Sequence, residues 1–113
     1  MNSTRIALTV FMIAGLCACG TVGRYEFSAI TFFESLETRN DHTFSYGCSS
    51  DVIGDEYAAK GTWAVEDGGT LVTTVVSAEG SSDSCLKPVQ RWQVTSKGVT
   101  AEGRNNLLRR KLP

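Results

Sequence analysis

Residues 57–76 of this 113-residue chain read YAAKGTWAVEDGGTLVTTVV, and this stretch decides the fold. In its first half, every second residue from Tyr57 is apolar or glycine, as expected for a strand with one buried face. The segment 67–69 (Asp-Gly-Gly) supplies residues that accept a positive φ, which makes it the clearest hairpin turn in the chain. Residues 71–76 are rich in Thr and Val and return as the partner strand. We therefore predict an antiparallel hairpin here.

Similar two-residue alternation continues on both sides of this hairpin, for example over residues 43–48 and 89–95. Phe33 interrupts the alternation, which indicates a bulge or a bend in that strand. Residues 107–112 either add a final short strand or form a basic tail. Short strands joined by tight turns, without an amphipathic helix, predict an all-β fold. We expect an antiparallel meander of about six to eight strands, in one domain over residues 24–113, forming a small barrel or sandwich.

Three motifs carry a resemblance to a known group of proteins. They are LETRNDHTFSY at residues 36–46, KGTWAV at 60–65 and DGGTLV at 67–72. Over residues 34–76 the chain resembles small lipocalin-like envelope proteins of bacteria, in which a strand, a tight turn, a G-x-W strand and a G-G-x-L hairpin follow one another. His42 stands where these proteins usually have Gly in the first turn. The resemblance implies a lipocalin-like barrel and no catalytic residue.

The N-terminus has the pattern of a secretory signal peptide. Arg5 is the only charge, and an apolar run over residues 6–16 follows it. This run is too short to cross a bilayer as a helix, which needs about 20 apolar residues. A buried hydrophobic strand or helix of the folded domain is the alternative interpretation.

Residues 16–20 read LCACG and resemble the lipobox of bacterial lipoproteins. The resemblance implies that the signal peptide 1–18 is removed, that Cys19 is lipidated, and that residues 19–23 form a tether behind the lipid. Several acyl chains hold a protein stably on a membrane. Because Gly20 rather than Asp follows the cysteine, the resemblance also implies anchoring in the outer membrane, facing the periplasm. Ordinary secretory cleavage after Gly20 is the competing interpretation.

Cys48 and Cys85 remain after processing, in an exported and therefore oxidising compartment. We predict a disulfide between them, which closes a loop of about 37 residues and contributes roughly 3.8 kcal/mol in the chain-entropy model. A metal site is not expected, since His42 is the only histidine and the chain has no ligand cluster.

Charge is distributed unevenly along the chain. Residues 26–83 contain eleven acids and two bases, whereas the residues from 84 onward contain seven bases and one acid. If the disulfide forms, the loops 49–56 and 77–84 share one end of the fold and gather five carboxylates. These are Asp51, Asp55, Glu56, Glu79 and Asp83. Such a cluster favours a basic protein partner or, more weakly, a calcium ion, unless the loops splay into solvent and bind nothing.

The sequence contains none of the common catalytic motifs, such as GxSxG, HExxH or a phosphate-binding glycine loop, so we expect neither an enzyme nor a cofactor. The basic residues 109–111 lack interleaved aromatics, so no nucleic-acid partner is expected. Two functions stay open. The first is a lipid-anchored binding or structural module of the envelope, using its loops or a small apolar pocket lined by Tyr46, Tyr57, Trp63 and Trp92. The second is a periplasmic inhibitor of a basic hydrolase such as lysozyme, although the Ser-Gly-x-x-Tyr motif of such inhibitors is absent.

Overall fold

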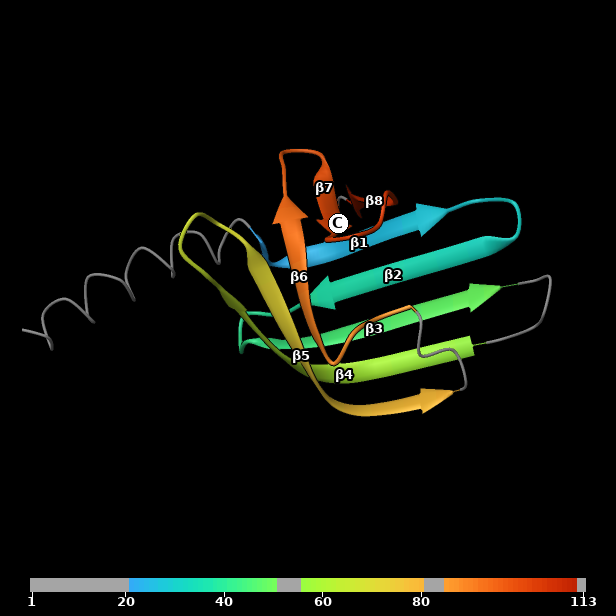
Figure 1. The fold of residues 1–113 in the computed structure, drawn as a ribbon, viewed down its shortest axis with the longest axis horizontal. Coiled ribbons are helices and arrows are strands. Elements are labelled where there is room, and N and C mark those ends of the chain that lie inside the picture. The colour runs from blue at the N-terminus through green and yellow to red at the C-terminus, as the bar shows by residue number, and fades with distance from the viewer. Residues whose placement is uncertain (1–20, 51–55, 81–84, 112–113) are drawn as a thin grey trace, which may run out of the picture.

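The computed structural model describes residues 21–50, 56–80 and 85–111, which form a closed barrel of eight antiparallel strands (Figure 1). Each strand pairs with the next one along the chain, and β8 closes the barrel against β1. The strands are β1 (Gly23–Ser28), β2 (Phe32–Thr38), β3 (Thr43–Ser50), β4 (Glu56–Val65), β5 (Leu71–Gly80), β6 (Val89–Val94), β7 (Gly98–Ala101) and β8 (Leu107–Lys111). The predicted all-β meander is confirmed, and it takes the form of a barrel.

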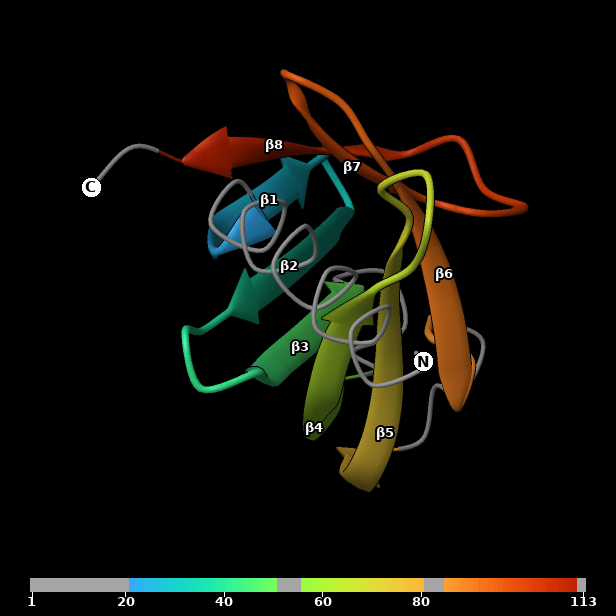
Figure 2. The ribbon, with the colours of Figure 1, turned by 90° about the vertical axis from the view of Figure 1, so that its left-hand side faces the viewer.

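The two ends of the barrel differ. One end holds residues 21–22 and the turns 39–42, 66–70 and 95–97, and we call it the N-terminal end. The other holds the turns 29–31 and 102–106 and the segment 85–88, and we call it the disulfide end. Figure 2 views the barrel from the N-terminal end, with β8 lying beside β1. The sequence allowed either a strand or a basic tail at residues 107–112. In the structure, residues 107–111 form the strand that completes the barrel.

Side chains that alternate along the strands fill the interior. β4 follows this rule most regularly, since its inward residues from Tyr57 to Trp63 are buried and the residues between them are exposed. Trp63 and Trp92 satisfy their indole N–H groups, which donate to the carbonyl oxygen of Arg39 (2.9 Å) and to Oγ1 of Thr73 (3.0 Å). The four aromatic residues considered for an apolar pocket are all buried members of the core: Tyr46, Tyr57, Trp63 and Trp92. Their side chains fill space that a ligand would need.

The irregularity expected at Phe33 lies elsewhere, so that prediction was wrong. β2 runs without interruption, and Phe33 points outward with 38% of its surface exposed. The register shifts instead between Lys60 and Gly61, where β4 pairs with β5. A Cβ atom on Gly61 would lie 1.9 Å from the carbonyl oxygen of Thr74, so only glycine allows this close approach of the two backbones. Phe33 is an aromatic residue on the outward face, so it interrupts the apolar pattern of β2 without interrupting the strand.

The turn between β2 and β3 has an unusual residue at its left-handed position. His42 has a φ of 67°, a conformation that glycine adopts most easily. The imidazole ring stacks on Trp63 with ring centroids 4.5 Å apart, and the backbone N–H of Trp63 donates to the carbonyl oxygen of His42 at 2.8 Å. These contacts stabilise the histidine in a backbone conformation that usually requires glycine.

None of the described residues forms a helix long and apolar enough to cross a membrane.

Candidate functional site

The predicted disulfide is present at one end of the barrel. Cys48 lies on β3, Cys85 lies in the segment before β6, and their Cα atoms are 6.6 Å apart. Both residues are buried. The bond therefore fastens the segment that leads into β6 onto the barrel wall.

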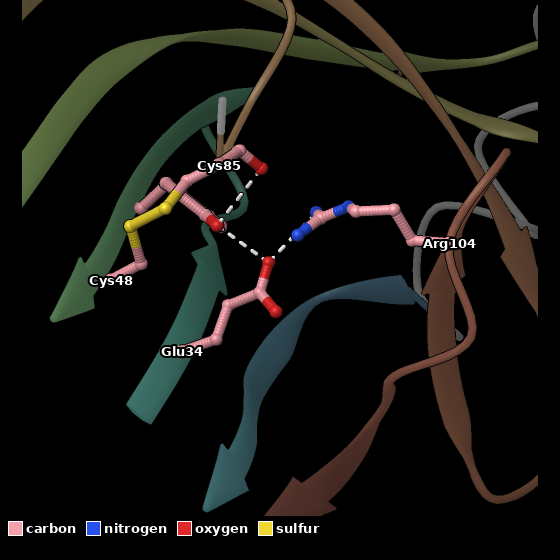
Figure 3. The surroundings of a disulfide bond; sticks show 5 residues. Glu34, Cys48, Cys85 and Arg104 are labelled. Carbon is pink, nitrogen blue, oxygen red and sulfur yellow. Dashed lines mark hydrogen bonds and ion pairs between the residues drawn. A yellow bond between two sulfur atoms is a disulfide. The ribbon is translucent and has the colours of Figure 1, made fainter. Parts of the chain in front are cut away.

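A buried polar network lies beside this bond. Glu34 on β2 is fully buried, and its Oε2 accepts a hydrogen bond from the hydroxyl of Tyr46 on β3 at 2.5 Å. The Tyr46 oxygen also lies 3.2 Å from the carbonyl oxygen of Cys85. Arg104, in the turn between β7 and β8, places Nη2 2.8 Å from the same carboxylate oxygen. Figure 3 shows Glu34 and Arg104 pointing toward each other next to the disulfide.

The charge of Glu34 is balanced inside the barrel by Arg104. The contact of Nη2 with Oε2 lacks hydrogen-bond geometry, so attraction between opposite charges holds the pair together. The other carboxylate oxygen, Oε1, is buried without a hydrogen-bond partner among the described residues. A carboxylate this deeply buried depends on its counter-charge. Within the described residues, the network joins β2, β3, the Cys85 segment and the β7–β8 turn, and we assign it a structural role.

The phenol of Tyr46 stays protonated in this environment. Burial raises the pKa of Tyr46 far above its ordinary value of 10.0, and the neighbouring Glu34 carboxylate raises it further. The nearby Arg104 works in the opposite direction and does not offset these effects. The protonated hydroxyl can therefore donate its hydrogen to Glu34.

A groove of about 370 Å³ runs over the outer face of β2, β3, β4 and the last part of β5, toward the disulfide end. The floor of the groove is low because three residues with small side chains or none lie next to one another on the outward face: Ser35, Gly47 and Ala58. A Cβ atom on Gly47 would make only ordinary contacts, the shortest being 3.6 Å. Phe33 supplies a partly exposed aromatic wall.

Two carboxylates line this groove. Glu79 on β5 pairs with Ala58, and Glu56 precedes Ala58 by two residues on the same face of β4, so both side chains project to one side. Both residues are exposed. β5 extends to Gly80 against β4, whereas its register with β6 ends at Thr74, so among the described strands the Glu79 segment is a sheet edge. No basic residue lines the groove within the described part of the chain.

The structure thus brings together two of the five predicted carboxylates, Glu56 and Glu79. Asp51, Asp55 and Asp83 lie outside the described residues, as does Cys19. Among the residues that the structure describes, no group of three or more His, Cys, Asp or Glu side chains is placed to hold a metal ion. The groove with its two acids is therefore the candidate site for a partner.

Sequence reasoning missed the Glu34 network. The position of Glu34, two residues before the buried Leu36 on one strand, was a signal that its side chain faces inward. Arg104 gave no comparable signal, because it lies in a turn 70 residues further along the chain.

No protein-family model matches the chain, and no curated protein or solved structure matches it either. The resemblances to bacterial lipoproteins and to lipocalin-like envelope proteins therefore stay predictions from the sequence.

Proposed function

We propose that the protein is a lipid-anchored binding module of the bacterial envelope, and that its acidic groove takes a basic protein partner. One observation carries the proposal: the N-terminal segment and the groove lie toward opposite ends of the barrel. Thr21 is buried at the N-terminal end, where its carbonyl oxygen accepts hydrogen bonds from Thr38 (2.5 Å) and Tyr25 (2.8 Å). A lipid on Cys19, two residues before Thr21, would direct the groove away from the membrane.

The chemistry of the groove favours a cationic protein surface. Its two carboxylates attract a basic residue and orient an approaching partner, an effect that is strongest at low ionic strength. Phe33 offers an apolar contact beside them, and aromatic residues are enriched in protein interfaces. The low floor at Gly47 leaves space for a long Lys or Arg side chain to lie across the strands.

A basic hydrolase such as lysozyme is one partner of this kind, and the acids of the groove favour it. The protein would then act as an inhibitor if the hydrolase binds the groove through the surface around its active site, so that the active site is covered. Binding without inhibition would identify a binding module alone.

The anchor is tested by the mass of the mature protein. We expect protein isolated from bacterial membranes to begin at Cys19 and to carry added acyl mass, because the lipobox-like residues 16–20 direct both steps. Replacing Cys19 with alanine should move the protein from the membrane fraction to the soluble fraction. A wild-type product that starts at Thr21 without acyl mass would contradict the anchor.

The groove is tested by binding to lysozyme in nonionic detergent, at about 20 mM and about 500 mM salt. We expect binding at low salt that high salt abolishes, because screening shortens the reach of exposed charges from about 20 Å to about 4 Å. Glu56→Gln with Glu79→Gln should weaken binding about tenfold, at roughly 0.7 kcal/mol for each lost carboxylate.

The matched control, Glu37→Gln with Glu102→Gln, removes the same charge outside the groove and should change the affinity less than twofold. Equal effects of the two double variants, or no binding at low salt, would refute the acidic groove as the binding site. A cell-lysis assay with the same variants separates inhibition from binding.

A further inference from the structure

We infer that the N-terminal end of the barrel carries a surface for anionic phospholipid headgroups, formed by Arg24, Lys97, Arg109 and Lys111. We call this surface the basic rim. The inference rests on the proposed lipid anchor and goes beyond it by identifying the face that meets the bilayer and the lipid chemistry that this face recognises.

The closure of the barrel brings these four bases together from distant parts of the sequence. Arg24 on β1 is the register partner of Lys111 on β8. Arg109, also on β8, pairs with Gly98, and the carbonyl oxygen of Lys97 accepts a hydrogen bond from the backbone of Arg110 at 3.1 Å. Figure 2 shows β8 lying directly beside β1. The rim thus combines β1, β8 and the β6–β7 turn.

The basic rim keeps an excess of positive charge. The side chains of Arg24 and Lys111 are 67% and 57% exposed, and Lys97 and Arg109 are also exposed. One carboxylate, Glu26, lies between the first two bases, 3.6 Å from Arg24 and 3.8 Å from Lys111. A second carboxylate, Glu37 on β2, is the register partner of Arg24 and lies 3.5 Å from Arg39. Four bases near these two carboxylates keep an excess of positive charge, which suits phosphate groups because they accept charge-assisted hydrogen bonds from arginine and lysine.

The N-terminal segment enters the fold beside this rim. The guanidinium group of Arg110 donates to the carbonyl oxygen of Val22 at 2.8 Å and to the hydroxyl of Tyr25 at 3.0 Å, and it lies over the Tyr25 ring. The residues that follow the proposed lipid are therefore fastened to β8. From Thr21 to Cys19 an extended chain spans at most about 7 Å. This length is close to the Debye length of about 8 Å at physiological ionic strength, so an acyl anchor would hold the rim within reach of the bilayer charge.

The other turns of the N-terminal end carry charges of both signs. Asp41, Glu66 and Asp67 lie in the turns that connect β2 to β3 and β4 to β5. Arg39 lies in the first of these turns, and Arg91 on β6 forms an ion pair with Glu66. An anionic bilayer attracts the net positive rim more strongly than these turns of mixed charge, so we expect the barrel to incline with β8 and β1 toward the headgroups. This inclination would turn the groove on β2–β5 further toward the periplasm.

The four lysines of the chain provide a direct test, since Lys97 and Lys111 belong to the basic rim and Lys60 and Lys87 do not. The lipidated protein is reconstituted into phosphatidylcholine vesicles, with or without about one third phosphatidylglycerol. The outward-facing lysines are then acetylated with a membrane-impermeant amine reagent and quantified by peptide mass spectrometry. We expect acetylation of Lys97 and Lys111 to be about fivefold slower in the anionic vesicles, with Lys60 and Lys87 unchanged. About 0.5 M salt should remove the difference, because it screens the attraction.

Arg24→Gln with Arg109→Gln should abolish most of the protection of Lys97 and Lys111, by removing half of the rim charge. The control Lys60→Gln with Lys87→Gln removes the same charge elsewhere and should leave the protection intact. Equal acetylation rates in both kinds of vesicle, with acyl mass present on Cys19, would overturn the basic rim and leave the anchor standing. Absence of acyl mass, with no sedimentation on either kind of vesicle, would overturn the anchor itself.

Discussion

Replacing Arg104 with methionine is expected to lower the free energy of unfolding by about 3–5 kcal/mol, because the variant leaves the Glu34 carboxylate buried without a counter-charge. The ion pair itself need not be a large source of stability, since burying both charges carries a desolvation cost. The large effect comes from removing the arginine alone, because the buried glutamate then keeps its charge without a partner. Tyr46 would remain as a hydrogen-bond donor, but a phenol does not neutralise the carboxylate.

Urea denaturation followed by tryptophan fluorescence measures this effect, since Trp63 and Trp92 are both buried reporters. The matched control combines Arg104→Met with Glu34→Gln, which removes both charges and keeps an oxygen that can accept the Tyr46 hydroxyl. We expect the double variant to recover at least half of the lost free energy. A loss below about 1 kcal/mol for Arg104→Met, or a double variant no more stable than the single one, would contradict the role of Arg104 as the counter-charge.

Removing the disulfide with Cys48→Ser and Cys85→Ser is expected to lower the free energy of unfolding by about 2–5 kcal/mol. The bond closes a loop with a sequence separation of 37 and therefore restricts the unfolded chain. It also holds the Cys85 segment, whose carbonyl oxygen lies 3.2 Å from the Tyr46 hydroxyl, against the buried network.

Thermal and urea unfolding of the double variant measure the loss, and reduced wild-type protein is the control. Because the reduced protein lacks the same covalent bond, its stability should agree with that of the double variant to within about 1 kcal/mol. Equal stability of the oxidised wild type and the double variant would refute the disulfide as a stabilising element.

Much of the fold could be predicted because the information is local. The alternation from Tyr57 to Val65 and the Asp-Gly-Gly turn define β4 and its hairpin without reference to the rest of the chain. The pairing of Cys48 with Cys85 could be predicted because the proposed processing would leave only these two free cysteines. The bulge was misplaced because its cause is not local: Gly61 is required by the approach of Thr74 and the Phe44 ring, and the alternation in β4 gives no sign of it.

The sequence by itself determined that the chain is an antiparallel β meander with one cross-link, an acidic first part and a basic last part. Only the tertiary structure decided which charges meet. Closing β8 onto β1 places Lys111 opposite Arg24, and the β7–β8 turn carries Arg104 to Glu34. The tertiary structure also places the acids of the groove and the bases of the rim toward opposite ends of the barrel. The physical reason is that strand periodicity is a property of neighbouring residues, whereas the encounter of distant charges depends on strand register and barrel closure, to which every strand contributes.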